Sequence, residues 1–155
     1  REFSTPAYWT SISGQWVYIS GMNDNLKAFR LSNDTLSPSP LSETPEIFQF
    51  PGVVPSISSN SNISGTGIVW IVSPPAECFY MGCNPHGSGV LRAYDATNLG
   101  NELYNSTQQP LRDQLDSYTK FSVPTIANGK VFVGTLTGLS IYGLLNTTTN
   151  INSNK

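Results

Sequence analysis

The chain has 155 residues, enough for one ordinary domain with a hydrophobic core. Only 12% of the residues are charged, well below the roughly 25% usual for soluble domains. The net charge is −2 and the eight Lys and Arg residues are spread singly, so the chain offers no basic stripe for a phosphate backbone. No stretch approaches the ~18 to 20 apolar residues of a membrane span. We therefore expect no nucleic-acid partner and no membrane span.

A similar run of residues occurs three times along the chain. Each copy has a proline-bearing opener, then an aromatic or β-branched run, then a run of the form Leu-x-Ala/Ile-aromatic; the openers contain Pro6, Pro55 and Pro124. Alternating apolar and polar residues of this kind predict short strands. Repeats of about 40 to 50 residues built from short strands are typical of propeller blades. The sequence therefore predicts an all-β fold: a β-propeller segment of about three four-stranded antiparallel blades, in an incomplete ring, over residues 1–145.

The three predicted blades follow one another along the chain. The first covers about residues 3–50, with strands near 3–9, 16–20, 26–31 and 46–50. The second covers 51–105, with strands near 53–58, 68–73, 90–95 and 101–105 and with insertions at 59–67 and 74–88. The third covers 120–145, with strands near 121–126, 130–135 and 138–144, and it lacks a fourth strand.

Local signals complete this prediction. Asn128-Gly129 is a strong two-residue hairpin signal between the first two strands of the third blade. Residues 111–118 are compatible with a turn or two of helix or with a loop. Residues 146–155 are polar and show no alternation, which predicts a flexible tail.

Three blades are too few for a closed ring, because propellers use about four to eight. Open sheet edges and faces favour association. The chain begins with Arg1 rather than Met, which indicates a processed product or a piece of something longer. We expect its partners to be the remaining blades of the same precursor or further copies of the chain.

Four segments resemble the C-terminal part of the quinoprotein-like β-propeller proteins, which carry PQQ-like repeats. These segments are residues 4–9 (STPAYW), 89–99 (GVLRAYDATNL), 120–135 (KFSVPTIANGKVFVGT) and 139–145 (LSIYGLL). Residues 95–104 also resemble the Asp-x-x-Thr-Gly-x-x-x-Trp motif that packs adjacent blades in that family. Asn98 stands where Gly is usual, and Tyr104 stands where Trp is usual.

The resemblance implies a fold and does not imply an activity. Dehydrogenases of that family hold pyrroloquinoline quinone between a Trp and a ring of adjacent cysteines, near a calcium ion. The chain has no adjacent cysteine pair, because its two cysteines are Cys78 and Cys83. We expect no cofactor on this chain; PQQ with calcium enters only if the chain is part of an oxidoreductase whose cofactor site lies elsewhere.

The two cysteines lie in a loop rich in Pro and Gly. Such close spacing predicts a loop-closing disulfide between Cys78 and Cys83 in an oxidising compartment, with two unpaired buried thiols as the alternative. The candidates for N-glycosylation lie in or beside predicted turns and are Asn33, Asn62, Asn105 and Asn146. Together these features favour a secreted protein.

Few residues suggest catalysis. His86 is the only histidine, which excludes a multi-histidine metal centre within one chain and favours an exposed loop residue. The densest charged group consists of Arg112, Asp113, Asp116 and Lys120. This group is either a polar surface site, in which two carboxylates could act as in glycosidases, or a solvated linker.

Aromatic residues are frequent and could stack on sugars, but most of them lie where blades pack. Trp9 and Tyr80 are the exceptions that could contact a sugar. We predict no catalytic, metal-binding or cofactor-binding residues. The favoured function is a secreted, non-catalytic binding or scaffold module. The alternatives are part of a quinoprotein-like oxidoreductase and a carbohydrate-binding lectin.

Overall fold

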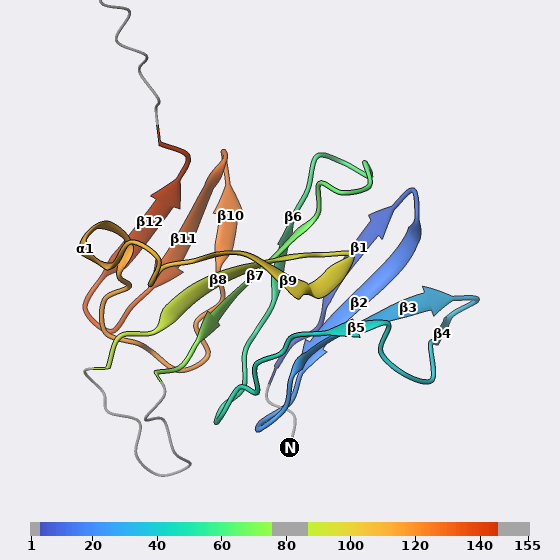
Figure 1. Cartoon of the computed structure of the whole chain (residues 1–155), viewed down its shortest axis with the longest axis horizontal. Coiled ribbons are helices and arrows are strands. Elements are labelled where there is room, and N and C mark those ends of the chain that lie inside the picture. The colour runs from blue at the N-terminus through green and yellow to red at the C-terminus, as the bar shows by residue number, and fades with distance from the viewer. Residues whose placement is uncertain (1–3, 76–86, 146–155) are drawn as a thin grey trace, which may run out of the picture.

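The computed structural model describes residues 4–75 and 87–145, which form an all-β protein with three antiparallel sheets. The sheets contain five, four and three strands in chain order. The second sheet lies between the first and the third (Figure 1). The predicted all-β class is therefore confirmed, and the third sheet lacks a fourth strand in the described residues, as expected. The first sheet has five strands instead of the four expected.

The first sheet differs from the prediction at its outer edge. Its strands are β1 (Ala7–Ser11), β2 (Gly14–Ser20), β3 (Leu26–Ser32), β4 (Thr35–Leu36) and β5 (Ser42–Glu43), and both β4 and β5 pair with β3. The prediction of a strand at 46–50 is wrong, because no strand forms there. The Leu41 and Thr44 amides already donate to β3 carbonyls, at 2.8 and 3.0 Å, so the edge of β3 is occupied. Phe48 instead forms a single bridge with Asp24.

The other two sheets contain all seven predicted strands, although β6 and β10 begin three and four residues later than expected and β9 begins three residues earlier. The second contains β6 (Ser56–Ser58), β7 (Ile68–Ser73), β8 (Val90–Asp95) and β9 (Asn98–Asn105). The third contains β10 (Thr125–Ala127), β11 (Lys130–Gly134) and β12 (Leu139–Gly143), after the one-turn helix α1 (Pro110–Asp113). Asn128 and Gly129 join β10 to β11 with φ values of 49° and 68°, the left-handed backbone that a tight hairpin turn requires.

The three repeated prolines hold the same place in the strand order. Pro6, Pro55 and Pro124 each precede the first residue of the first strand of a sheet. Proline suits this place because it has no N–H to give to a ladder. The three first strands also lie close together, since β6 contacts both β1 and β10. The three prolines thus stand at the same place relative to the first strand of each sheet.

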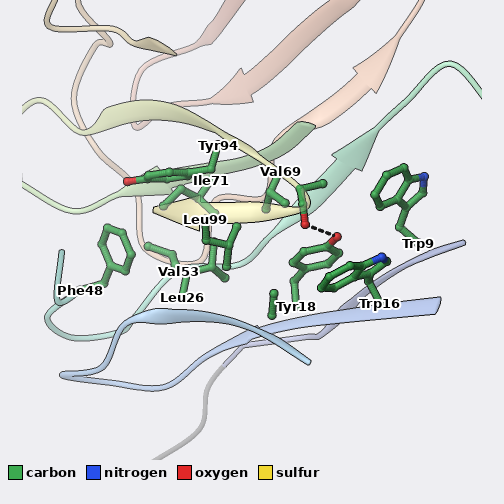
Figure 2. Close-up of a cluster of buried hydrophobic side chains, with 12 residues drawn as sticks. Trp9, Trp16, Tyr18, Leu26, Phe48, Val53, Val69, Ile71, Tyr94 and Leu99 are labelled. Atoms are coloured by element: carbon green, nitrogen blue, oxygen red, sulfur yellow. Dashed lines mark hydrogen bonds between the residues drawn. The ribbon is translucent and has the colours of Figure 1, made fainter. Parts of the chain in front are cut away.

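The first inter-sheet layer, between the first and second sheets, is a continuous buried core (Figure 2). Tyr18 is fully buried there, and its hydroxyl donates to the Ala96 carbonyl of the second sheet at 2.8 Å. Trp9 and Trp16 are each 5% exposed. Trp9 is therefore not available to a sugar, which corrects its place among the exceptions, whereas Trp16 packs between sheets as expected of most of the aromatic residues. The cluster comprises Trp9, Trp16, Tyr18, Leu26, Ala28, Phe48, Val53, Val69, Ile71, Tyr94, Ala96 and Leu99.

The second inter-sheet layer lies between the second and third sheets. Its buried cluster comprises Val72, Leu91, Leu115, Tyr118, Val131 and Val133. Trp70, Tyr104, Ile126 and Tyr142 pack against this cluster while remaining partly exposed. Trp70 therefore lies inside this layer, as expected of most of the aromatic residues. The central sheet is thus covered on both of its faces.

Candidate binding site

The predicted charged group is divided by the fold. Arg112 and Asp113, at the end of α1, form an ion pair in which Nε lies 2.5 Å from Oδ1 and Nη2 lies 2.6 Å from Oδ2. The Tyr104 hydroxyl donates to Asp113 Oδ2, and the Tyr142 hydroxyl donates to the Asp113 carbonyl, both at 3.0 Å. The hydrogen bond from the Arg112 guanidinium lowers the pKa of Asp113 below its ordinary value. Asp113 therefore joins α1 to β9 and β12.

The other two members of the group lie elsewhere. Asp116 accepts hydrogen bonds from the Thr137 hydroxyl and, at 2.7 Å, from the Ser117 amide. The Thr137 hydrogen bond is the main reason why the pKa of Asp116 is lowered. Lys120 Nζ lies 5.0 Å from the centre of the Phe50 ring. Neither side chain bonds to the Arg112–Asp113 pair in the described part of the chain, so these four residues do not form one site.

The glycosylation candidates differ in how their amides are engaged. Asn33 and Asn62 are exposed in turns, where an acceptor would be reachable. Asn105 is half-buried, and its Nδ2, the atom that would carry the glycan, donates to Glu102 Oε2 at 2.7 Å. Asn33 and Asn62 are therefore better placed than Asn105. Several predicted features lie outside the described residues: Asn146, Tyr80, His86, and the Cys78–Cys83 disulfide.

A pocket of about 930 Å³ opens between the second and third sheets. This volume falls within the range of about 300 to 1,000 Å³ that is typical of small-molecule sites. Three partly exposed aromatic side chains, Trp70, Tyr104 and Tyr142, line it. Arg112 and Lys130 also line it, together with Asp113. The pocket thus combines an aromatic wall with a few charged groups.

The repeated sequence explains why this pocket is open. Trp9 stands three residues after Pro6 and faces Trp16 across the β1–β2 ladder. At the same place in the second sheet, Ser58 stands three residues after Pro55 and faces Ile68. Two indoles in the first layer are therefore replaced by a hydroxymethyl group and a branched butyl group in the second. The smaller side chains leave space unfilled.

Other contacts close the equivalent end of the first layer. The Trp9 indole Nε1 donates to Ser59 Oγ at 3.1 Å. The ring lies so close to Gly67 that an added Cβ would meet it at 2.6 Å. The sequence-based prediction missed the pocket. Aligning the repeats by their prolines would have shown that Ser58 stands where the first repeat has Trp9.

The charged groups of the pocket are not equally engaged. The two tyrosine hydroxyls already donate to Asp113, and Asp113 is paired with Arg112. Burial, followed by the nearby Asp113, raises the pKa of Tyr142 to about 12, so its hydroxyl is neutral at physiological pH. The Lys130 ammonium makes no hydrogen bond or ion pair within the described residues. Lys130 stands two residues before Phe132 in β11, so its side chain lies on the face of the sheet opposite to the buried Val131 and Val133.

The sequence-based prediction missed a second charged network. It joins Glu46, in the loop that follows the first sheet, to side chains of the second sheet. Arg92 Nη1 lies 2.5 Å from Glu102 Oε1 and 3.5 Å from Glu46 Oε1. The Tyr94 hydroxyl donates to Glu46 Oε2 at 3.1 Å. Burial alone would lower the pKa of Arg92, but the neighbouring Tyr94, Glu102 and Glu46 outweigh it and raise the pKa. The network holds Arg92 charged and its partners in place.

Residues 4–75 and 87–145 contain no group of three or more acidic, histidine or cysteine side chains suited to a metal ion. None of their helices has the length and apolar character needed to cross a membrane. Comparisons of the chain with protein-family models, curated proteins and solved structures gave no significant match. The resemblance to quinoprotein-like propellers therefore stays a prediction.

Proposed function

We propose that the chain is a segment of a secreted β-propeller and acts as a non-catalytic binding or scaffold module. In this proposal each of its sheets is a blade. The observation that carries the proposal is the uncovered apolar face of the third sheet, on the side away from the central sheet. A further sheet packed on this face would remove its exposed apolar side chains from water.

The arrangement of the three sheets supports a propeller. In propellers, consecutive sheets surround a central channel. Here the first strands β1, β6 and β10 are neighbours, as expected if they were the innermost strands. Consecutive sheets are also joined through residues 95–104, the segment that resembles the blade-packing motif. Asp95 Oδ1 accepts from the Thr97 amide at 2.8 Å, and the Leu99 amide donates to Ser42 Oγ of the first sheet at 3.1 Å.

The third sheet leaves one face open to solvent. In the β11–β12 ladder Phe132 faces Ile141 and Gly134 faces Leu139, on the side opposite to the buried Val131 and Val133. Ile141 is 57% exposed and Leu139 is 61% exposed. Exposed apolar surface of this kind on a soluble protein commonly marks an interaction site.

The first sheet has a corresponding outer face. Tyr8, Val17 and Phe29 lie in register across β1, β2 and β3, on the side opposite to Trp16 and Tyr18. Tyr8 is 55% exposed, while Val17 and Phe29 are half-buried. Both ends of the three-sheet stack therefore offer apolar side chains to a neighbour. The partners that fit are further blades of the same precursor or other copies of the chain.

Light scattering at low micromolar concentration tests this proposal. We expect a particle heavier than the 16.8 kDa chain. The double substitution Leu139→Lys/Ile141→Lys should reduce the mass, because it places charges on the open face of the third sheet. Asn101→Lys adds a charge at an exposed polar position of β9 and is the matched control. A folded, monodisperse wild-type species of 16.8 kDa would contradict the proposal.

A further inference from the structure

We infer that the pocket between the second and third sheets binds a small, flat and uncharged molecule, which has a bicyclic aromatic body and carries a hydroxyl or carbonyl group. This inference goes beyond the scaffold role, because side chains of two sheets of this chain form the pocket without any partner. Its test does not depend on the oligomeric state.

The first layer shows which kind of group fits between two of these sheets at this place. Trp9 faces Trp16 across the β1–β2 ladder, and both indoles belong to the core that the first sheet shares with the second. Ser58 faces Ile68 at the corresponding place in the second sheet, on the face that Trp70 turns toward the third sheet. Because protein interiors pack at crystal-like density, the space that the two indoles fill in one layer accepts a body of similar shape in the other. A bicyclic aromatic ring system has that shape.

The wall of the pocket offers ring faces and aliphatic surface. Trp70 and Tyr104 supply rings from the second sheet. Ile126 and Tyr142 extend the wall on the third sheet, and these side chains remain partly exposed beside the second buried cluster. Aromatic groups stack well on aromatic side chains in offset or edge-to-face arrangements. Small-molecule sites are typically lined in this way, with only a few polar groups.

The described lining offers no unpaired charge to a ligand. Arg112 and Asp113 pair with each other, at an Nε–Oδ1 distance of 2.5 Å. Lys130 faces Gly143 across the β11–β12 ladder, on the side opposite to Val131, and a Cβ added at Gly143 would lie 3.5 Å from Lys130 Cγ. A charged ligand would lose hydration in the pocket without gaining a counter-ion, which is costly. The lining therefore favours an uncharged ligand.

Two serine hydroxyls supply the hydrogen bonds that remain for a ligand. Ser58 Oγ accepts from the Trp70 indole Nε1 at 2.8 Å, and its own proton has no acceptor in the described residues. Ser140 faces the fully buried Val133 across the β11–β12 ladder, so it lies on the pocket side, and it makes no hydrogen bond within residues 4–75 and 87–145. A sugar would leave most of its hydroxyls without partners here, which is costly. One hydroxyl or carbonyl group on a flat body suits these two serines.

Three probes separate flatness from charge. 2-Naphthol is flat, uncharged at neutral pH and carries one hydroxyl. Decahydro-2-naphthol has the same skeleton and hydroxyl without the flat aromatic rings, and naphthalene-2-sulfonate has the flat rings with a negative charge. Each probe is titrated into the whole chain by isothermal titration calorimetry. We expect 2-naphthol to bind at least several-fold more tightly than either of the other two.

Three variants assign the binding to the pocket. Ser58→Trp places an indole where the first layer has Trp9, so it should weaken 2-naphthol at least tenfold. Thr125→Trp adds the same indole at an exposed position that faces Phe132 on the open side of the third sheet, and this matched control should leave the binding unchanged. Ser140→Ala removes one hydroxyl from the lining and should weaken 2-naphthol a few-fold.

Nuclear magnetic resonance locates the probe without any variant. The chain has three tryptophans, so a nitrogen-15-labelled sample gives three indole N–H signals, which single Trp→Phe substitutions assign. We expect 2-naphthol to shift the Trp70 signal and to leave those of Trp9 and Trp16 in place, because only Trp70 lines the pocket.

Several results would overturn the inference. An unshifted Trp70 signal, or unchanged 2-naphthol binding to folded Ser58→Trp, would place the probe outside the pocket. Equal binding of decahydro-2-naphthol would remove the preference for a flat body, and equal binding of naphthalene-2-sulfonate would remove the preference for an uncharged one. Absence of 2-naphthol binding at millimolar concentration would overturn the site itself.

Discussion

Between the first and second sheets, Trp9 and Trp16 are each 5% exposed, whereas between the second and third sheets Ser58 and Ile68 stand in the equivalent places beside a pocket of about 930 Å³. Both layers have the same strand order and the same proline position. The difference in packing between the two layers therefore comes from side-chain volume at a few positions, and not from the arrangement of the strands. Protein interiors are packed at crystal-like density, so losing two indoles without compensation leaves a real space.

The two layers also use their tyrosines differently. Tyr18 crosses the first layer with a fully buried hydroxyl that bonds to the Ala96 carbonyl at 2.8 Å. Tyr104 reaches Asp113, a carboxylate that already accepts hydrogen bonds from Arg112. The first layer thus contains a fully buried Tyr18–Ala96 hydrogen bond that no other group replaces. In the second layer the acceptor is the Asp113 carboxylate, which is partly exposed to water. The first layer should therefore be the stronger one.

The largest expected effect comes from truncating one tryptophan in each layer. Trp16→Ala should cost about 4 kcal/mol of the free energy of unfolding, because it leaves a cavity in a filled core. Trp70→Ala should cost about 2 kcal/mol, because this side chain already borders open space. Urea denaturation measures both values. Equal losses would mean that the two layers are equally packed.

A smaller loss of stability is expected at the close contact between Gly67 and the Trp9 ring in the first layer. Gly67→Ala should destabilise the fold by about 2 kcal/mol, because the new methyl group would meet the Trp9 ring. Gly134→Ala is the matched control, since nothing lies within 4 Å of the added Cβ. The same denaturation experiment compares the two variants. Tolerance of both would contradict the close contact between Trp9 and Gly67.

Removing the hydroxyl of one tyrosine in each layer should change the free energy of unfolding by less than the substitutions above. Tyr18→Phe leaves the Ala96 carbonyl buried without its partner, which should cost about 1.5 kcal/mol. Tyr104→Phe should cost about 0.5 kcal/mol, because Asp113 keeps its hydrogen bonds from Arg112. Thermal unfolding of both variants tests the order. A larger loss for Tyr104→Phe would reverse our account of the layers.

The smallest effect concerns acid stability. The Arg112 hydrogen bond keeps the pKa of Asp113 below its ordinary value, so the ionised form is favoured in the folded state. This stabilisation is present above the pKa of the unfolded state and is lost as the pH falls through the folded-state value. Asp113→Asn should therefore make the stability slightly less dependent on pH below about 4. An unchanged acid slope in urea titrations would contradict a contribution from Asp113.

Much of the strand pattern could be predicted because its signals are local. The residues after Pro55 and Pro124 carry clear alternation, and Asn128-Gly129 defines its own turn. The missing strand at 46–50 could not be predicted in this way, because pairing depends on which segment occupies the edge of β3 in the folded chain. The Leu41 and Thr44 amides occupy that edge, and no local sequence pattern indicates this.

The candidate site was less predictable than the strands. Charge density along the chain grouped Asp116 and Lys120 with Arg112, but the loop after α1 carries these side chains to different neighbours. The pocket depends on a comparison between repeats, since Ser58 is unremarkable until it is aligned with Trp9. Sequence proximity is a weak guide to a site that two sheets form together.

Acrylamide quenching of tryptophan fluorescence tests the difference between the layers most directly. Trp70→Phe leaves only Trp9 and Trp16 as indoles, and Trp9→Phe/Trp16→Phe leaves only Trp70, because the chain has three tryptophans. With folding of both variants checked by circular dichroism, we predict a quenching constant several-fold larger for Trp70, which borders the pocket. Equal quenching in the two variants, or stronger quenching of Trp9 and Trp16, would contradict a filled first layer and an open second one.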